Sequence, residues 1–286
     1  MTNELQIVVE NLNALWNTPK HTFPGPQPVS IERKNFTTLK SMEYLIGHKN
    51  DGERYALCFI RHNDKPRCFL LNRTLGTTYI SLLVSRKLYE GSIFDCELID
   101  NNLHIFDCPL FAGKSLKSVN FLERLSYCKT FISALRTRDS DGYTFSTKQF
   151  VSRLNYNQLE KCEKSDGYIF VPLHKPVQTG THMSYFKWKP LLQNTIDFAM
   201  CEKKKVYLQN AGKLCKSKVE LDLSEISCES IEFVKDTVIL ECQFVSADKW
   251  KALHIRHDKV LPNSSFTFKK TLINIEENVK FSELVS

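Results

Sequence analysis

Apolar and polar residues alternate in many segments of the first two thirds of this chain, as in β-strands that bury one face. We expect strands around residues 44–46, 55–60, 68–71, 91–99, 103–107, 165–170 and 185–190. Two other segments, 5–12 and 121–135, place apolar residues three and four positions apart and predict amphipathic helices. A further helix is expected over 150–162. The pattern predicts an α+β fold.

The pattern changes after residue 197, where short strands follow one another closely and are separated by polar breaks. These strands are expected at 205–208, 216–223, 231–234 and 238–244. Such spacing suits a small β-barrel, and an OB-fold is the form we expect. We therefore predict one domain over 1–196 and an OB-fold domain over 197–271. A last helix is expected to begin at residue 271.

Composition narrows the class of protein. The 286 residues are 42% hydrophobic, and 39 basic residues against 32 acidic ones give a net charge of +7, which leans mildly toward anionic partners. The ten cysteines form no C-x-x-C pair and no cluster with zinc spacing. With no secretory signal at the N-terminus, we expect free thiols in a reducing compartment. No apolar run is long enough to span a membrane.

The segment His48-Lys49-Asn50-Asp51-Gly52-Glu53-Arg54 is predicted to form a turn between two strands. A lysine there can act as a nucleophile once it loses its proton, which costs about 4–5 kcal/mol at neutral pH for an ordinary lysine. Desolvation and a neighbouring cation such as Arg54 lower that cost. The alternative is a polar turn whose charges are only solvated.

A second charged segment is Tyr185-Phe186-Lys187-Trp188-Lys189-Pro190. Strand alternation places Lys187 and Lys189 on one face and the two aromatic residues on the other. Two adjacent lysines repel each other, so we expect an anion such as a phosphate to lie beside them.

These segments resemble, in order, the motifs of mRNA capping guanylyltransferases of the compact, virus-like type. The nucleophile motif is K-x-D-G-x-R at 49–54, and the proline-rich segment 23–30, expected to be a loop, reads FPGPQPVS. FKWKP and TIDF follow at 186–190 and 195–198, and R-x-D-K stands at 256–259. TLINIEEN, at 271–278, belongs to a C-terminal helix, 272–286, that the resemblance packs back on the first domain. His48, Asn50 and Cys96 depart from the family pattern.

The resemblance also implies roles for single residues. Lys49 would be the nucleophile that bonds to GMP, with Arg54 in its motif. Lys187 and Lys189 would contact the α-phosphate, and Arg73 the sugar and phosphate. The other implied contacts are Phe106 stacked on the purine, Glu97 on ribose or metal, Asp166 on the metal, and Arg256 and Lys259 on the β- and γ-phosphates; Asp258 would bind substrate or brace Arg256. Asp95 shares a strand face with Glu97, so either could serve.

Two near-identical segments compete for the metal-binding aspartate, 140–145 and 165–170. We choose Asp166 in the second, because that segment continues into Val171 and Pro172 as a buried strand should. Asp141, in the first, is expected to lie in a loop between two helices.

The family's reaction transfers GMP from GTP, with Mg²⁺ or Mn²⁺, to the 5′-diphosphate end of RNA. The fold implied is a nucleotidyltransferase domain of antiparallel sheets with flanking helices, followed by the OB-fold, which closes over GTP and then opens. An RNA triphosphatase and a cap methyltransferase would come from other chains. We expect a monomer in the nucleus or cytoplasm, or in a viral factory if the chain is viral. The alternatives are an ATP-dependent polynucleotide ligase and a non-catalytic RNA-binding subunit.

Overall fold

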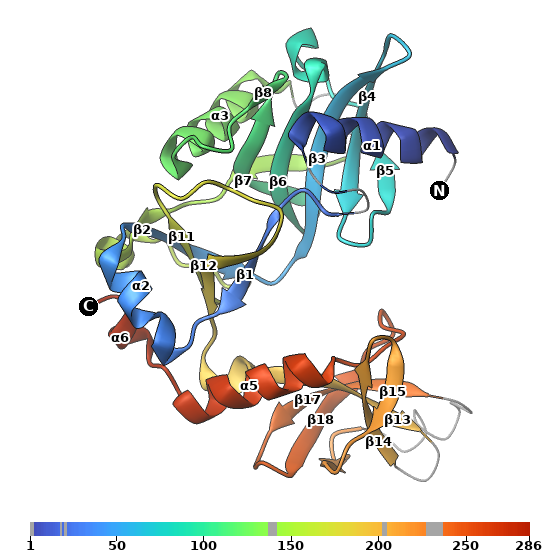
Figure 1. The fold of residues 1–286 in the computed structure, drawn as a ribbon, viewed down its shortest axis with the longest axis vertical. Coiled ribbons are helices and arrows are strands. Elements are labelled where there is room, and N and C mark those ends of the chain that lie inside the picture. The colour runs from blue at the N-terminus through green and yellow to red at the C-terminus, as the bar shows by residue number, and fades with distance from the viewer. Residues whose placement is uncertain (1–2, 18, 20–21, 137–141, 202–204, 227–236) are drawn as a thin grey trace. The chain divides into compact units, whose positions relative to one another are not determined.

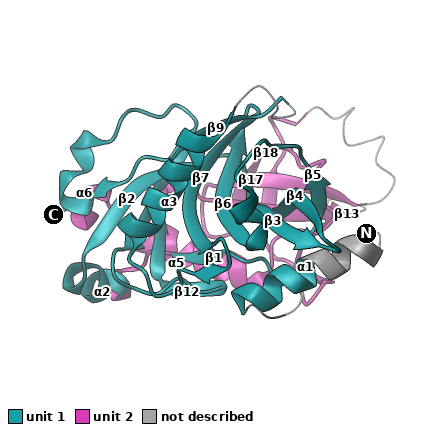
Figure 2. Ribbon diagram, turned by 90° about the horizontal axis from the view of Figure 1, so that it is seen from above, with its two compact units in different colours: residues 1–29, 35–188, 285–286 teal, residues 30–34, 189–284 magenta. Residues whose placement is uncertain are grey.

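The computed structural model describes residues 3–17, 19, 22–136, 142–201, 205–226 and 237–286 (Figure 1). The chain divides into two compact units (Figure 2). The first unit comprises residues 1–29, 35–188 and 285–286, and the second comprises 30–34 and 189–284. Sheets dominate both units and helices flank them, so the predicted α+β class is confirmed.

A seven-stranded sheet forms the centre of the first unit, with the order β5-β4-β3-β6-β7-β8 and β9 paired in parallel to β7. Its other strand pairs are antiparallel. The strands are β3 (Glu53–His62), β4 (Lys65–Asn72), β5 (Thr77–Tyr79), β6 (Ser92–Ile99), β7 (Asn102–Phe111), β8 (Lys114–Ser115) and β9 (Thr144–Thr147).

One helix covers each face of this sheet, because β3 alternates apolar side chains toward both faces. Leu57 and Phe59 pack in a cluster with Phe131 of α3 (Phe121–Ala134). Ala56 and Cys58 pack instead with the buried side chains of α1 (Asn3–Trp16). Both faces of β3 are therefore buried, which explains why its sequence is an almost continuous run of apolar residues.

A five-stranded sheet completes the first unit, with the order β1-β12-β11-β2-β10. Its strands are β1 (Pro26–Ser30), β2 (Tyr44–Asn50), β10 (Val151–Ser152), β11 (Ser165–Pro172) and β12 (Gly180–Trp188). Leu45, Val171 and Tyr185 pack against Phe121 at the start of α3. The five-stranded sheet therefore packs against the N-terminus of α3 through apolar side chains.

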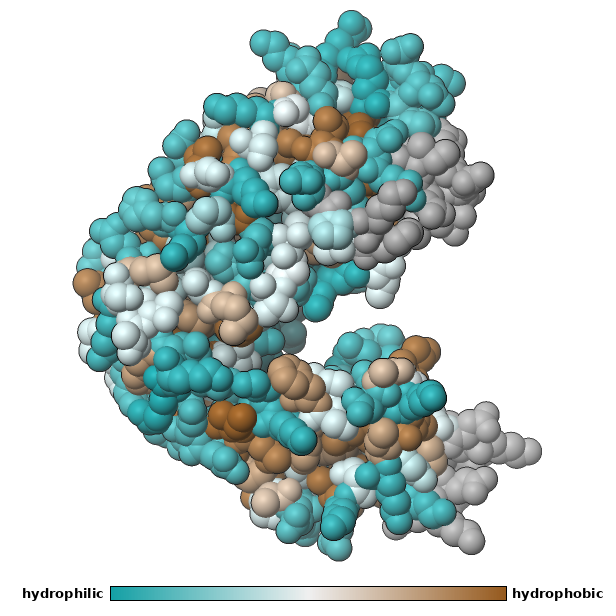
Figure 3. All heavy atoms as spheres, in the orientation of Figure 1, coloured by the Kyte–Doolittle hydropathy of each residue, from teal (hydrophilic) through white to brown (hydrophobic). Residues whose placement is uncertain are grey.

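The second unit is built on a six-stranded sheet with the order β15-β14-β13-β17-β18-β16. Its strands are β13 (Thr195–Cys201), β14 (Lys205–Asn210), β15 (Lys213–Lys216), β16 (Glu220–Asp222), β17 (Val238–Phe244) and β18 (Lys249–Ile255). Helix α5 (Ser265–Glu277) begins where the Ser264 hydroxyl accepts a hydrogen bond from the amide of Thr267, and its Ile275 enters the core around Trp250. Hydrophobic residues also appear among hydrophilic ones on the viewed surface (Figure 3), as is usual for a folded protein.

The remaining helical segments are short. They are α2 (Phe36–Ser41), α6 (Phe281–Leu284) and 3₁₀ turns at Arg33–Asn35, Arg86–Glu90, Arg153–Gln158 and Leu191–Gln193. No helix among the described residues has the length and apolar character needed to cross a membrane. Nine cysteines in the described ranges are free thiols.

Three expected elements differ from the structure. The helix predicted over 150–162 is wrong, because Val151 pairs with Ile46 as a strand and a 3₁₀ turn follows. The proline-rich loop contains strand β1, which lies at a sheet edge where prolines are tolerated. The last helix begins at Ser265 rather than at residue 271, because Ser264 caps it.

Other expectations stay predictions. The boundary expected at 196/197 falls inside β13, and the helix expected to return to the first domain contributes to the core of the second unit. Where an OB-fold was expected, the structure describes a six-stranded sheet, and the closed barrel stays a prediction. The strand predicted at 231–234 and the loop residue Asp141 lie outside the described residues.

Candidate active site

Lys49 and Asp166 form an ion pair in the five-stranded sheet. Lys49 lies at the end of β2, not in the turn that we expected, and Gly167 of β11 is its cross-strand partner. The next register position pairs Ser165 with Asn50, so Asp166 is an extra, bulged residue. Its Oδ1 lies 2.6 Å from Lys49 Nζ, and the two side chains are only 12% and 21% exposed. The ammonium group of Lys49 is therefore held by one carboxylate in a mostly buried position.

Arg54 is locked in place by Asp95. Its Nε and Nη2 donate to the two carboxylate oxygens of Asp95 at 2.8 and 2.5 Å, and its Nη1 donates to the carbonyl of Pro26 at 2.7 Å. Burial raises the pKa of Asp95, although the positive charge of Arg54 acts to lower it. Burial disfavours the guanidinium, but Asp95 outweighs it and raises the pKa of Arg54. Both oxygens of Asp95 are thus taken up by Arg54, so of the two carboxylates only Glu97 makes no hydrogen bond to this arginine among the contacts described.

Lys148 is a residue of this site that the sequence analysis missed. Its Nζ lies 3.3 Å from Glu97 Oε2 and 5.3 Å from the centre of the Phe106 ring. The Arg54 guanidinium carbon lies 5.6 Å from the same ring centre. Burial lowers the pKa of Lys148, and the positive charges of Lys49 and Arg54 lower it further. The negative charge of Glu97 acts in the opposite direction but does not cancel this shift. Lys148 follows the short strand β9, whose alternating TFST pattern was the signal available in the sequence.

Phe106 occupies a second bulge. Asp107 pairs with Asp95 and Ile105 with Cys96, so Phe106 is an extra residue in β7 with no partner of its own in that register. The bulge lets Phe106 approach Arg54, whereas regular alternation alone would not specify that orientation.

The three departures from the family pattern have contacts of their own. The His48 ring stacks on Tyr168 at 5.3 Å, and Asn50 Nδ2 donates to the sulfur of Cys162 at 3.2 Å. Cys96 is fully buried in the apolar cluster between the sheet and α3. Cys96 therefore belongs to the core, and Asp95 and Glu97, which flank it, make the charged contacts with Arg54 and Lys148.

Three other predicted residues sit at strand ends. Lys187 pairs with Ile169 across β12 and β11, two positions after the buried Tyr185. Lys189 comes directly after Trp188, the last residue of β12. Arg73 follows β4, and partial burial, together with the positive charge of Arg54, lowers its pKa. Their contacts with phosphate stay predictions.

In the second unit, Arg256 is surrounded by carboxylates. Its Nη1 lies 3.2 Å from Asp197 and 3.0 Å from Glu241, and its other nitrogens hold both oxygens of Asp258 at 2.8 and 2.9 Å. The bond to Arg256 lowers the pKa of Asp258 to about 2. Asp258 therefore braces Arg256 in this structure. The amide of Lys259 closes a turn on the Arg256 carbonyl at 3.2 Å.

The metal prediction can be tested against the donor groups. Within the described ranges, no group of three or more His, Cys, Asp or Glu residues is arranged to hold an ion. Asp166 and Glu97 offer carboxylates, each of which faces a lysine. Such a set fits Mg²⁺, which is often held by one or two carboxylates plus substrate phosphates.

Comparisons with known proteins cover almost the whole chain. The family model for the catalytic domain of mRNA capping enzyme matches residues 1–191, and the model for its C-terminal domain matches residues 193–285. The chain is 23% identical to an mRNA-capping enzyme subunit alpha of Schizosaccharomyces pombe over 99% of its length and 84% of the relative's. A Kluyveromyces lactis subunit alpha is 29% identical over 70% of this chain, and a Danio rerio mRNA-capping enzyme 24% over 90%.

This chain spans only 51% and 48% of the last two relatives, respectively. Among solved structures, a mycobacterial DNA ligase D complexed with ATP and MES aligns with 83% of this chain and 94% of its own. The identity is 13% and the TM-score 0.44, which is too low to assign the fold.

Proposed function

The chain belongs to the mRNA capping enzyme family, and we propose that Lys49 is the residue through which it transfers GMP from GTP to RNA. The observation that carries the proposal is the bulge that brings Asp166 to Lys49 inside the matched catalytic domain. The enzyme would be an RNA guanylyltransferase.

The first step forms a bond between Lys49 Nζ and the α-phosphorus of GTP. Lys49 gives up a proton to water, its lone pair then attacks phosphorus, and the bond from phosphorus to the leaving pyrophosphate breaks. Lys187 and Lys189 neutralise charge on the α-phosphate as it develops. Arg73 holds the sugar and phosphate, and Arg54, fixed by Asp95, keeps the far end of the nucleophile motif in place.

The second step reverses the bonding at Lys49. A terminal phosphate oxygen of 5′-diphosphate RNA attacks the phosphorus of the lysyl-GMP, the nitrogen–phosphorus bond breaks, and Lys49 regains a proton. The product carries a GpppN end. Phe106 stacks on the purine, a contact worth about 1–3 kcal/mol that tolerates any base.

Asp166 and Glu97 would hold the Mg²⁺ or Mn²⁺ ion, which supplies charge neutralisation at the phosphates. Lys259 is proposed to contact the β- and γ-phosphates. Arg256 would do so only by giving up part of its carboxylate contacts, so we assign it first to holding the R-x-D-K turn. The OB-fold, the monomeric state and the supply of triphosphatase and methyltransferase by other chains remain parts of the proposal.

The test is label transfer from [α-³²P]GTP to the protein in the presence of Mg²⁺. We expect wild type to become labelled, Lys49→Ala to stay unlabelled, and Lys161→Ala, which removes an exposed lysine, to label like wild type. Labelled Lys49→Ala protein would contradict the assignment. Labelling by [α-³²P]ATP and not by GTP would favour the ligase, and no adduct with either nucleotide would favour the non-catalytic subunit.

A further inference from the structure

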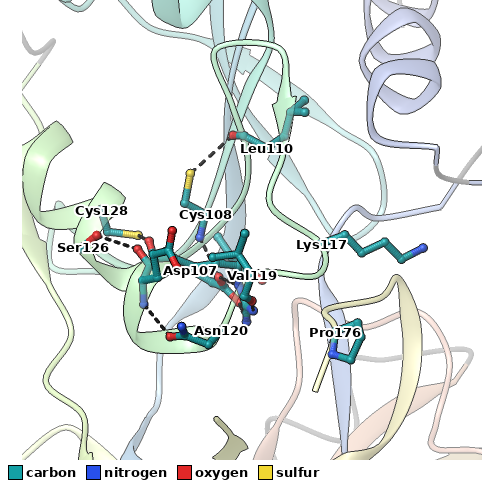
Figure 4. Close-up of polar contacts among 12 residues, drawn as sticks. Asp107, Cys108, Leu110, Lys117, Val119, Asn120, Ser126, Cys128 and Pro176 are labelled. Atoms are coloured by element: carbon teal, nitrogen blue, oxygen red, sulfur yellow. Dashed lines mark hydrogen bonds and ion pairs between the residues drawn. The ribbon is translucent and has the colours of Figure 1, made fainter. Parts of the chain in front are cut away.

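Arg124 is a fully buried cation that the proposed mechanism does not use. It lies in the first turn of α3, and its side chain is 0% exposed. Its Nε and Nη2 donate to Asp107 at 2.7 and 3.0 Å, its Nη1 donates to the Val119 carbonyl at 2.6 Å, and Nη2 also reaches the Tyr185 hydroxyl at 3.1 Å. Figure 4 shows Asp107 and Val119 beside Asn120, which caps this helix.

The partners of Arg124 come from both sheets of the first unit. Asp107 belongs to β7 of the seven-stranded sheet, and Tyr185 belongs to β12 of the five-stranded sheet. Asp107 follows the bulged Phe106 directly, and Tyr185 stands two positions before Lys187. One guanidinium therefore links the strand that carries the proposed base-stacking residue to the strand that carries a proposed phosphate ligand.

Asp107 also makes a hydrogen bond to the backbone of its own strand. Its Oδ1 accepts a hydrogen bond from the amide of Cys108 at 2.7 Å, which fixes the backbone immediately after Phe106. Burial disfavours the charged Arg124, but the charge of Asp107 outweighs it and raises the pKa of Arg124. The pair thus remains charged and fixed inside the protein.

A buried ion pair is weak grounds for a stability role, since apolar residues often do as well. Its position between two site-bearing strands is more informative. We propose that Arg124, Asp107 and Tyr185 are positioning residues, which hold Phe106 and Lys187 in the mutual geometry that GTP needs. The inference rests on the proposed function of Phe106 and Lys187. None of the three is proposed to touch GTP, because all three are buried.

The mildest test is Tyr185→Phe, which removes one hydroxyl and leaves Asp107 paired with Arg124. The rate of GMP attachment to Lys49 is measured against GTP concentration. We expect the half-saturating GTP concentration to rise roughly tenfold, the size of one lost hydrogen bond to a charged group. Tyr127→Phe, a matched change on α3, should leave it within about twofold of wild type.

A double-mutant cycle separates an effect on the position of Phe106 from a general loss of stability. If Tyr185 acts through Phe106, Tyr185→Phe should have little further effect in a Phe106→Leu background. An unchanged half-saturating concentration for Tyr185→Phe, or a full tenfold rise in the Phe106→Leu background, would overturn the inference. Should Tyr185→Phe not fold, Arg124→Lys, which keeps the charge and loses the fork, carries the same expectations. Wild type that takes no label refutes the proposed function instead.

Discussion

The ammonium nitrogen of Lys49 lies 2.6 Å from Asp166 Oδ1, and the contact exists because β11 carries one residue more than β2 at this point. A bulge re-aims a side chain that regular alternation would direct elsewhere. Phe106 reaches its place in the same way, by a bulge in β7. Two irregularities, one in each sheet of the first unit, thus supply the proposed nucleophile's carboxylate partner and the proposed purine platform.

The pairing of Lys49 with Asp166 predicts which of the two near-identical segments matters. Asp166→Ala should lower GMP attachment by roughly 100-fold or more, because it removes a proposed ligand of the metal ion that neutralises the phosphates. Asp141→Ala, in the other segment, should label near the wild-type rate. Quantitative label transfer from GTP measures both variants. The reverse ranking would mean that Asp141 is the functional carboxylate and that the Lys49 contact is incidental.

A side chain at position 25 is predicted to impair the protein, because Arg54 and Asp95 occupy the space beside Gly25. A Cβ at Gly25 would lie 2.5 Å from Asp95 Oδ2 and 2.6 Å from Arg54 Nη2, so the ion pair would have to shift. We expect Gly25→Ala to lose about 1–3 kcal/mol of stability and at least about tenfold in GMP attachment.

The control for Gly25 is Gly212→Ala, in the turn between β14 and β15. At Gly212 φ is +82° and no atom lies close to the added carbon, so only the backbone strain of the positive φ is introduced. The free energy of unfolding, measured in urea, should therefore fall by about 1 kcal/mol. Label transfer by this variant should match wild type. If both variants lose stability equally and only Gly25→Ala loses activity, the effect belongs to Arg54 and not to general destabilisation. Full activity in Gly25→Ala would contradict the prediction.

Lys148 predicts a pH dependence of stability. Its pKa in the folded protein is lower than the ordinary value of 10.5, so between the two pKa values the unfolded chain binds more protons. The free energy of unfolding should therefore gain from Lys148 as pH rises through that window. Urea unfolding at a series of pH values tests this direction: wild type should gain stability relative to Lys148→Met as the pH rises toward 10.5. A constant difference between the two proteins would show that Lys148 is not desolvated as the structure has it.

The sequence supplied candidate residues for this site but not their geometry. The Lys49 motif and the FKWKP strand were identifiable because each is a local string with its own chemistry. The bulges at Asp166 and Phe106 depend on the partner strand and leave no local trace. Lys148 was missed although the short strand before it alternates, because the position of Lys148 follows from the pairing of β9 with β7. The helix expected at 150–162 failed where Val151 joined the sheet, an override of local spacing by tertiary contact.

The brace between Arg256 and Asp258 predicts an acid titration in the second unit. Asp258 should protonate at a pKa of about 2, below its ordinary 3.8, because Arg256 holds both its oxygens. The stability it contributes is present above pH 3.8 and is lost as pH falls through about 2. Carboxyl-carbon NMR shifts against pH measure this directly. Arg256→Gln should move the pKa of Asp258 back toward 3.8, whereas Lys251→Gln, which breaks the exposed pair with Glu225, should leave it near 2. A pKa near 3.8 for Asp258 in wild type would show that the brace is absent in solution and leave Arg256 available for phosphate.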